Sequence, residues 1–385
     1  MHVLYVSDVY FPRVNGVSTS IRTFRDDLGA VGIATTLVAP DYGVAGSGAD
    51  DDGVLRVPAR AVPRDPEDRR MRWGALRGTL ASAAARGIDL VHIQTPFIAH
   101  YAGVRAARRA GVPVVATYHT FFEEYLHHYV PALPRALGRG IARAFTRAQC
   151  ADVTALIAPS APMRDLLLDY GVGTPVHVLP TGLPADRLRA GDGARFRAGH
   201  GIEGGRPLLL FVGRVAHEKN IDFLLRMHAR LLRVRPDALL MIAGEGPARD
   251  ALARQAAQLG SADGVRFIGY LDRDRDLLDC YAAADLFVFA SRTETQGLVL
   301  LEAMAQGTPV VSTAELGTRS ILEPGCGAVV LPESEDAFAQ AIVALLADGH
   351  ERARLGALGR GHAGRWSSAA KARELAALYR QLVLR

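Results

Sequence analysis

The sequence has little lysine and little cysteine. Lys219 and Lys371 are its only lysines, and the other 43 of its 45 basic residues are arginine. We interpret that bias as a property of the coding sequence, but it draws attention to Lys219, because lysine offers a compact ammonium that arginine lacks. The cysteines (Cys150, Cys280 and Cys326) are far apart and lack the spacing of a metal site, which indicates reduced, unreactive thiols.

Apolar runs are also short. None approaches the roughly 20 residues that span a bilayer, which argues against a membrane-spanning protein. The first residues, MHVLYVSDVY, are typical of a strand, and they lack the basic leader and cleavable apolar core of a signal peptide. We therefore expect a cytoplasmic protein.

The chain length and the order of its apolar segments predict the fold. A chain of 385 residues exceeds one ordinary hydrophobic core, so two domains are expected. Almost wholly apolar strands alternate with amphipathic helices, which predicts parallel sheets covered on both faces. The pattern restarts after a polar, glycine-rich bridge near 183–206. We expect an α/β protein with two doubly wound, Rossmann-like domains facing a cleft: residues 1–185 with the terminal helix 367–385, and residues 200–366.

Ligands of such domains bind where the strands end, so the loops that follow the strands should carry the functional residues. Residues 46–70 are charged and are interpreted as a flexible excursion of the first domain. No dinucleotide fingerprint of the G-x-G-x-x-G type is present, which argues against a nicotinamide or flavin cofactor site.

Two glutamates eight positions apart form one candidate site. Glu294 lies in a polar turn, and Glu302 lies in a helix that is predicted over 295–306 with Thr295 as its cap. That helix is apolar nearly all round, so Glu302 should be buried, and a buried carboxylate needs partners. Either the hydroxyls of a sugar diol donate to Glu302, or it is a structural residue paired with an arginine.

A second candidate site is the segment FVGRVAHEKN. Arg214 and Lys219 follow an apolar strand, and Gly213 allows a close backbone approach. Two cations at the carboxyl end of a strand are suited to phosphate oxygens. The alternative is a solvated loop with an unconnected pair of charges.

Glycines follow three further strands. GEGP, with Gly244 and Gly246, and RFIGYL, with Ile268, would let a nucleotide base or ribose approach the backbone. In YFPRVNGVSTS, Gly16 precedes a helix with polar caps, and its amide would suit a phosphate. Ordinary turns explain each of these segments equally well.

The segment YHTFFEEYLHHYVP follows another apolar strand. It places Tyr118 and His119 at the end of that strand. Its later histidines, His127 and His128, lack the H-E-x-x-H spacing and cysteine support of a zinc site, so we expect no metal.

Taken together, these motifs resemble the retaining glycosyltransferases of family 4, which have the two-domain GT-B fold. The resemblance covers essentially the whole chain. It implies that Arg214 and Lys219 hold the diphosphate of a nucleotide-sugar donor, that Glu294 contacts the sugar and that Glu302 accepts from the ribose. It places His119 beside the donor sugar and implies further donor contacts at Gly16, Gly213, Gly244, Gly246, Ile268, Gln296, Gly297 and Leu298.

The resemblance also implies a reaction without metal or cofactor. Arg214, Lys219 and the start of the helix near Gln296 would stabilise the leaving diphosphate electrostatically. No carboxylate is placed by the sequence as a nucleophile. The resemblance implies front-face attack, in which the departing phosphate accepts the proton of the acceptor.

The acceptor is expected to be a membrane lipid such as diacylglycerol, because YHTFFEEYLHHYVP and TETQGL look like the subgroup that glycosylates such lipids. An independent indication is a predicted helix whose basic and apolar sectors are opposite. The basic sector holds Arg135, Arg139, Arg143 and Arg147, and the apolar sector holds Leu133, Leu137, Ile141, Phe145 and Ala148. Such a helix suits an anionic membrane surface, with Tyr118 a further contact, although an ordinary surface helix over a core has the same pattern.

Other functions fit some of these observations. A soluble or polyprenyl-linked saccharide acceptor is the main alternative to a lipid, and a sugar-nucleotide epimerase could have the same fold. For the donor we favour a UDP-sugar over GDP-mannose. Nucleic-acid binding explains neither the buried glutamate nor the loops at the strand ends, so we expect no nucleic-acid partner.

Overall fold

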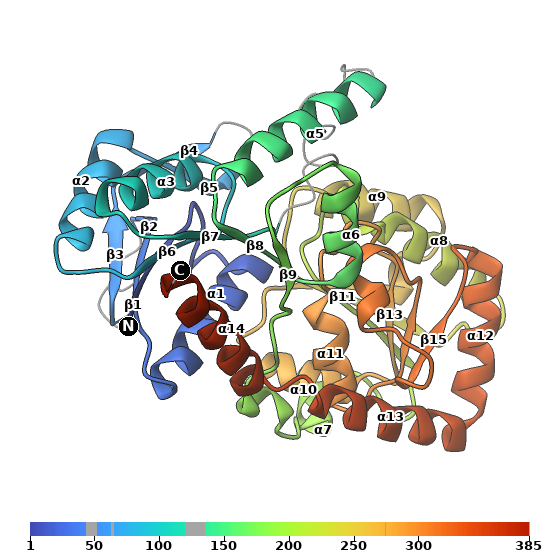
Figure 1. The fold of residues 1–385 in the computed structure, drawn as a ribbon. Coiled ribbons are helices and arrows are strands. Elements are labelled where there is room, and N and C mark those ends of the chain that lie inside the picture. Colours follow the sequence, from blue (N-terminus) through green and yellow to red (C-terminus); the bar gives the residue numbers. More distant parts are fainter. Residues whose placement is uncertain (44–51, 63–64, 120–134, 274, 385) are drawn as a thin grey trace. The chain divides into compact units, whose positions relative to one another are not determined.

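A computed structural model describes residues 1–43, 52–62, 65–119, 135–273 and 275–384. Its contacts divide the chain into two units. Unit 1 comprises Met1–Gly182 with Ser368–Arg385, and unit 2 comprises Leu183–Ser367. Each unit has its own parallel sheet and its own hydrophobic core (Figure 1).

The sheet of unit 1 has seven parallel strands in the order β3-β2-β1-β6-β7-β8-β9. They are β1 (His2–Val6), β2 (Ala34–Pro40), β3 (Val54–Val57), β6 (Leu90–Ile93), β7 (Val114–Thr117), β8 (Ala155–Ala158) and β9 (Val176–Val178). The chain moves outward from β1 in one direction and from β6 in the other, so the loops after these two neighbours diverge. Such a switch point opens a crevice at the carboxyl ends of the strands.

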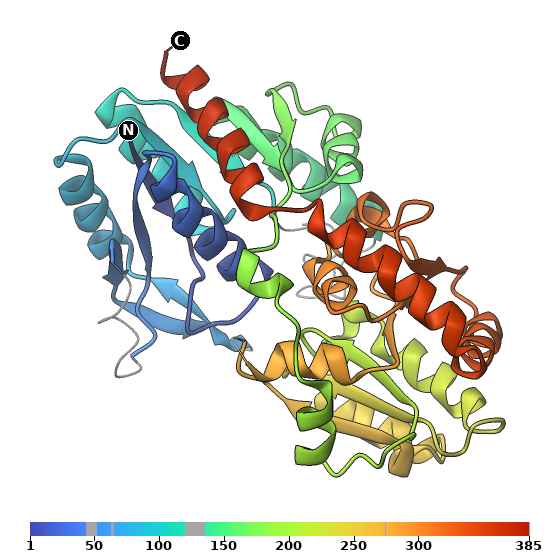
Figure 2. The ribbon, with the colours of Figure 1, turned by 90° about the horizontal axis from the view of Figure 1, so that it is seen from below.

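Helices cover both faces of this sheet. They are α1 (Gly16–Ala30), α2 (Trp73–Ala84), α3 (Ile98–Ala110), α5 (Arg135–Ala151), α6 (Ala161–Asp169) and α14 (Ser368–Val383). The terminal helix α14 lies beside α1 in Figures 1 and 2, and its Tyr379 hydroxyl is 2.8 Å from the Tyr5 hydroxyl of β1. The expected return of the terminal helix to the first domain is therefore confirmed.

The prediction that residues 46–70 form a flexible excursion is wrong for much of its length. Strand β3 extends the main sheet, pairing Leu37 of β2 with Val54. Strands β4 (Ala59–Val62) and β5 (Asp65–Met71) form an antiparallel pair. These strands were not predicted because their sequence is charged. Edge strands and two-stranded sheets have exposed faces, so they lack the continuous apolar pattern of central strands.

The sheet of unit 2 has six parallel strands in the order β12-β11-β10-β13-β14-β15. They are β10 (Leu208–Val212), β11 (Leu239–Ala243), β12 (Val265–Gly269), β13 (Leu286–Phe289), β14 (Val310–Ser312) and β15 (Ala328–Val330). Strands β10, β11 and β13 are buried along their whole length, which explains their continuous apolar sequences. The switch point of this unit lies between β10 and β13.

The helices of unit 2 form two groups, and the members of each group contact one another. One contains α8 (Ile221–Leu231), α9 (Arg249–Gln258) and α12 (Glu335–Ala347), and the other contains α7 (Gly193–Gly199), α10 (Asp276–Ala283), α11 (Leu298–Ala305) and α13 (Gly349–Gly364). Right-handed crossovers that run in opposite directions from the switch point place such groups on opposite faces. Both expected doubly wound sheets are confirmed, and among the described residues no helix has the length and apolar character to cross a membrane.

Candidate active site

The switch point of unit 2 joins two residues that are 75 positions apart in the sequence. Lys219 follows β10 and Glu294 follows β13, and these strands are neighbours in the sheet. The Lys219 Nζ donates to Glu294 Oε1 at 2.6 Å, and only 18% and 20% of the two side chains are exposed. Lys219, the one lysine of unit 2, and Glu294 thus form a partly buried ion pair.

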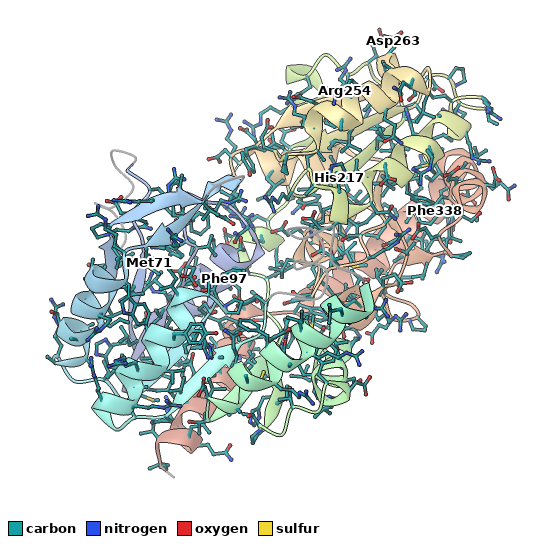
Figure 3. All side chains as sticks on the ribbon, turned by 90° about the horizontal axis from the view of Figure 1, so that it is seen from above. Met71, Phe97, His217, Arg254, Asp263 and Phe338 are labelled. Atoms are coloured by element: carbon teal, nitrogen blue, oxygen red, sulfur yellow. The ribbon has the colours of Figure 1, made fainter. Side chains whose placement is uncertain are left out.

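The backbone around Lys219 is held by its neighbour Asn220. Lys219 ends a short 3-10 turn, His217–Lys219, in which His217 is labelled in Figure 3. Asn220 then adopts the left-handed conformation with φ of 55°, and its Nδ2 donates to the carbonyl of Ala290 at 3.1 Å. Asparagine tolerates this conformation better than most residues. The side chain of Asn220 therefore ties the lysine loop to the end of β13.

Glycines let the loops after β10 and β11 pack backbone against backbone. Gly244 has φ of +132°, and a Cβ atom there would overlap the carbonyl oxygen of Gly213. Hydrogen bonds connect the two loops: the Gly213 amide donates to Ala243 at 3.0 Å, and the Val215 amide donates to Glu245 at 2.9 Å. The GEGP segment thus supports the loop that carries the two cations.

Arg214 and Ile268 also lie at this edge of the sheet. Arg214 directly follows Gly213, and its Nη1 is 3.9 Å from Glu218 Oε1. Ile268 lies in β12 and is partly buried against the core. The amide of Gly244 donates to the carbonyl of Gly269 at 2.8 Å, which connects the ends of β11 and β12.

Glu302 is buried, as predicted, with 4% of the residue exposed. Its two oxygens have separate partners within unit 2: Arg273 Nη2 donates to Oε1 at 3.0 Å, and the Tyr281 hydroxyl donates to Oε2 at 2.8 Å. Burial and the adjacent carboxylate raise the pKa of Tyr281 well above its usual value, so the phenol remains a donor. The arginine-paired alternative is therefore realised, and burial of Glu302 does not depend on a nucleotide.

The helix that contains Glu302 begins later than predicted. Helix α11 starts at Leu298 and its N-cap is Gly297, with φ of 96°, so Thr295 is not the cap. A Cβ atom on Gly317 would overlap the carbonyl oxygen of Thr295, and the Gly317 amide donates to the carbonyl of Glu294 at 2.9 Å. The backbone of Gly317 thus packs against the turn that contains Glu294 and Thr295, and the helix begins after this turn. Gln296, between Glu294 and the N-cap, is buried.

In unit 1, His119 follows β7 and pairs with a residue that the sequence analysis did not identify. His119 Nε2 is 3.0 Å from Oε1 of Gln94, which follows the neighbouring strand β6. Burial lowers the pKa of His119 to about 4, so its ring is neutral at pH 7. The pairing of β6 with β7, which local sequence does not reveal, is what brings Gln94 to His119.

Gly16 and Tyr118 occupy other positions in unit 1. Gly16 is the first residue of α1, which is capped by Asn15 accepting from the Ser18 amide at 2.8 Å. The Tyr118 hydroxyl is 3.2 Å from Thr146 Oγ1 of α5. Tyr118 therefore packs against the helix that was expected to bind membranes.

The buried residues of helix α5 are small or polar, and two of its large apolar residues are exposed. Its buried face contains Ala142, Thr146, Gln149 and Cys150. Leu137 and Ile141 are 56% and 46% exposed. The described part of α5 thus covers the core of unit 1 with one face and leaves Leu137 and Ile141 on its outer face.

The arginines of α5 differ in their surroundings. Arg139 and Arg147 are exposed, and the Arg143 guanidinium lies 4.9 Å from the ring centre of Tyr170. Arg143 therefore also contributes to packing within unit 1. The side chains of Arg135 and the preceding Leu133 lie outside the described residues.

Among the described residues, no group of three or more His, Cys, Asp or Glu side chains could hold a metal ion. His127 and His128, with Glu123 and Glu124, lie in the range 120–134, outside the described residues. The three cysteines are buried. Burial raises the pKa of the Cys150 thiol to about 12, which favours the unreactive protonated form.

Two known families match this chain. Residues 192–362 match the family described as Glycosyl transferases group 1, and residues 14–187 match Glycosyltransferase Family 4. The chain is 34% identical over 325 residues to the alpha-monoglucosyldiacylglycerol synthase of Streptococcus pneumoniae, covering 81% of this chain and 71% of that protein. It is 30% identical over 368 residues to a GDP-mannose-dependent alpha-mannosyltransferase of Mycobacterium tuberculosis, covering 92% and 89%.

The fold is also similar to solved structures. Anabaena HepE, determined in complex with UDP-glucose, matches with a TM-score of 0.77 and 18% sequence identity over 99% of this chain and all of that one. At this identity the likeness concerns the fold alone. It agrees with the two parallel sheets described above.

Proposed function

The chain belongs to the family 4 glycosyltransferases and is a nucleotide-sugar glycosyltransferase, and we propose that it is a retaining, metal-independent enzyme that glycosylates a membrane lipid such as diacylglycerol. The observation that carries this proposal is the Lys219–Glu294 ion pair at the switch point of unit 2. Loops at such a point are where doubly wound domains bind nucleotides.

Lys219 is suited to a diphosphate while it remains paired with Glu294. An ammonium has three donors, and one of them reaches Glu294 Oε1 at 2.6 Å. The other two have no partner among the described residues and can donate to phosphate oxygens, and Arg214 adds a second cation to the same loop. Glu294 then fulfils two roles: it orients the lysine, and its second oxygen accepts from a hydroxyl of the sugar.

Glu302 can bind ribose without losing its present partners. A carboxylate has about four lone-pair positions, of which Arg273 and Tyr281 use two. The ribose hydroxyls would take the others. Arg273 and Tyr281 thus hold the Glu302 side chain in place before a nucleotide binds, which reduces the cost of ordering the site.

The proposed reaction occurs on one face of the sugar. The bond between the anomeric carbon and the acceptor oxygen forms as the bond to the diphosphate breaks, and the departing phosphate oxygen takes the acceptor proton. Lys219 and Arg214 stabilise the charge that develops on the diphosphate. His119 is neutral, so we assign it a hydrogen bond to a hydroxyl of the transferred sugar and no charge stabilisation.

A lipid acceptor is supported by helix α5 and by one relative. Exposed Leu137 and Ile141 accompany exposed Arg139 and Arg147 on this helix, the combination expected of a helix that lies on an anionic bilayer. The Streptococcus relative is named for a glycolipid product. We propose that the enzyme acts at the inner face of the membrane.

Calorimetric titration with UDP and with GDP, in the absence of metal, tests the donor site. We expect micromolar binding of UDP and about 100-fold weaker binding to Glu302→Ala, because hydrogen bonds to a charged group contribute about 1.5–3 kcal/mol each. Tyr281→Phe keeps the carboxylate and should bind UDP within about tenfold of wild type. Binding of GDP alone would indicate a mannose-type donor, and binding of neither nucleotide would contradict the proposed site.

The acceptor is tested by transfer from UDP-glucose to diacylglycerol in phosphatidylglycerol vesicles. The expected product is an α-linked glucolipid, and proton NMR of the anomeric position reports the retained configuration. Transfer only to soluble or polyprenyl-linked saccharides would contradict the lipid proposal while leaving the donor site intact. Release of a changed nucleotide sugar with no acceptor present would indicate an epimerase.

A further inference from the structure

A row of polar side chains connects the buried part of unit 1 to His119. His92 of β6 and Thr117 of β7 lie on one face of the sheet, and Gln94 and His119 follow these two strands. The strands pair in register, His92 with Val115. Two side-chain hydrogen bonds cross between them: His92 Nε2 with Thr117 Oγ1 at 2.7 Å, and Gln94 Oε1 with His119 Nε2 at 3.0 Å.

The far end of this row is fixed by the terminal helix. The Tyr379 hydroxyl of α14 bonds to His92 Nδ1 at 2.5 Å and to the Tyr5 hydroxyl of β1 at 2.8 Å. Burial lowers the pKa of His92 and raises that of Tyr379, so both groups are uncharged at pH 7. The titratable groups of this row are Tyr5, His92 and Tyr379, and a charge on His119 disfavours a charge on His92.

Gln94 is placed to set the protonation of one ring nitrogen. Only 2% of the residue is exposed, and its Nε2 has no hydrogen-bond partner among the described residues. A buried amide donor without a partner is unfavourable. Another contact of Gln94 must therefore offset the free-energy cost of burying its Nε2 group. That contact is the bond to His119. Phe97, labelled in Figure 3, marks the start of α3 at the end of the Gln94 loop.

We propose that Gln94 is a positioning residue that holds His119 with its proton on Nε2 and the lone pair of Nδ1 available to a hydroxyl of the substrate. A carbonyl oxygen accepts, so Gln94 Oε1 requires the N–H to be on Nε2. A neutral imidazole carries one proton, so Nδ1 is then an acceptor. The role of the hydroxyl rests on the proposed function, whereas the position of the proton does not.

Nitrogen-15 NMR of the imidazole side chains tests the position of the proton directly. The His119 resonances are assigned by their absence in His119→Asn. In the wild type we expect the Nε2–H form of His119 to dominate, and in Gln94→Leu a mixture with the Nδ1–H form. Gln381→Leu, the same substitution at an exposed position of α14, should leave the His119 spectrum unchanged.

Two further readouts separate positioning from mere support of the fold. In Gln94→Glu, a carboxylate beside the ring should keep the Nε2–H form and raise the measured pKa of His119 by at least about one unit. In Gln94→Leu, kcat should fall about tenfold, as for one lost hydrogen bond, while the affinity for UDP remains unchanged because Lys219, Glu294 and Glu302 lie in unit 2. If Gln94→Leu does not fold, Gln94→Asn replaces it, since the shorter amide cannot span the same distance.

An unchanged His119 tautomer in Gln94→Leu, or an unchanged His119 pKa in Gln94→Glu, would overturn the proposal. Failure of the proposed function is distinct. In that case sugar transfer is absent from the wild type while the tautomer responds to Gln94 as expected.

Discussion

The two units share an architecture but carry different polar groups at the ends of their central strands. In unit 2 two ion pairs follow the strands: Lys219 pairs with Glu294 at the switch point, and Arg273, after β12, pairs with Glu302 of α11. In unit 1 a neutral pair, Gln94 and His119, follows β6 and β7, one strand along from the switch point between β1 and β6. Both sets of side chains are largely buried, so the difference does not follow from access to water.

The difference follows from what each unit is proposed to bind. A diphosphate is anionic, and paired cations in a partly buried site bind it without a large cost of reorganisation. A sugar hydroxyl is neutral, and a buried charge beside it would have no compensating partner. The same fold can thus present ionic or neutral hydrogen-bonding groups, depending on which residues follow its strands.

Removing the lysine of unit 2 should have the largest effect. We expect Lys219→Ala to reduce kcat/KM about 10²- to 10³-fold, the range seen when one group that stabilises a developing charge is lost. The matched control is Lys371→Ala, which removes the only other lysine and breaks an ion pair with Glu374 of 2.8 Å. Steady-state kinetics of both variants provide the comparison.

The control should retain activity within about twofold, because Lys371, whose side chain is similarly exposed at 22%, lies in α14 of unit 1 and outside the proposed diphosphate site. Both variants should unfold near the wild-type temperature, since a partly exposed pair contributes little to stability. Equal activity of Lys219→Ala and Lys371→Ala would remove the basis for the charged site of unit 2.

The basic residues of α5 should have an intermediate effect, limited to membranes. Each arginine near an anionic surface contributes about 1 kcal/mol, so Arg139→Ala with Arg147→Ala should weaken vesicle binding about 30-fold. The effect should shrink as salt is added, because ions screen the attraction. Flotation with phosphatidylglycerol vesicles measures it.

The control for α5 is the double variant Arg105→Ala and Arg109→Ala, which removes the same charge from exposed positions of α3. If both double variants lose vesicle binding equally, net charge and not α5 determines docking. Replacing Leu137 and Ile141 by serine tests the apolar part of the contact, and this effect should not depend on salt.

The smallest expected effect is on stability as a function of pH. Burial holds His119 of unit 1 and His228 of unit 2 at a pKa of about 4, below the ordinary value of 6.5. Between these values the unfolded chain binds protons that the folded chain does not, so the free energy of unfolding falls as the pH falls from 6.5 toward 4. We expect each histidine to contribute a loss of at most about 3 kcal/mol, measured by urea unfolding.

Asp8 of unit 1 acts in the opposite direction. Burial raises its pKa from 3.8 to about 6, so the folded chain binds the extra proton in that window and is stabilised as the pH falls. Asp8→Asn should therefore steepen the loss of stability between pH 6 and 4, and His228→Leu should flatten it. A pH profile that neither substitution alters would show that these groups do not control acid stability.

Local sequence patterns predicted much of the fold and some of the site. The apolar strands, the position of Lys219 directly after one of them and the burial of Glu302 were all confirmed. The start of α11 was not, because Gly317, far along the chain, determines how the preceding turn packs. The strands within residues 46–70 were missed for a related reason, since their charged sequence lacks a continuous apolar pattern.

Partners of the buried groups were beyond the reach of sequence reasoning. Arg273 and Tyr281 lie 29 and 21 positions before Glu302, in segments with no motif of their own. Gln94 lies 25 positions before His119 and precedes an ordinary helix. Long-range contacts of this kind depend on which strands and helices become neighbours, and short-range periodicity carries no information about that.

The sequence by itself determined which residues follow the strands, because every strand of a parallel sheet ends at the same edge and the apolar runs mark those ends. Only the tertiary structure decided which of these residues meet. Lys219 reaches Glu294 because β13 pairs with β10, and His119 reaches Gln94 because β7 pairs with β6. Strand order is a property of the whole sheet, set by backbone hydrogen bonds between segments that are distant in the chain.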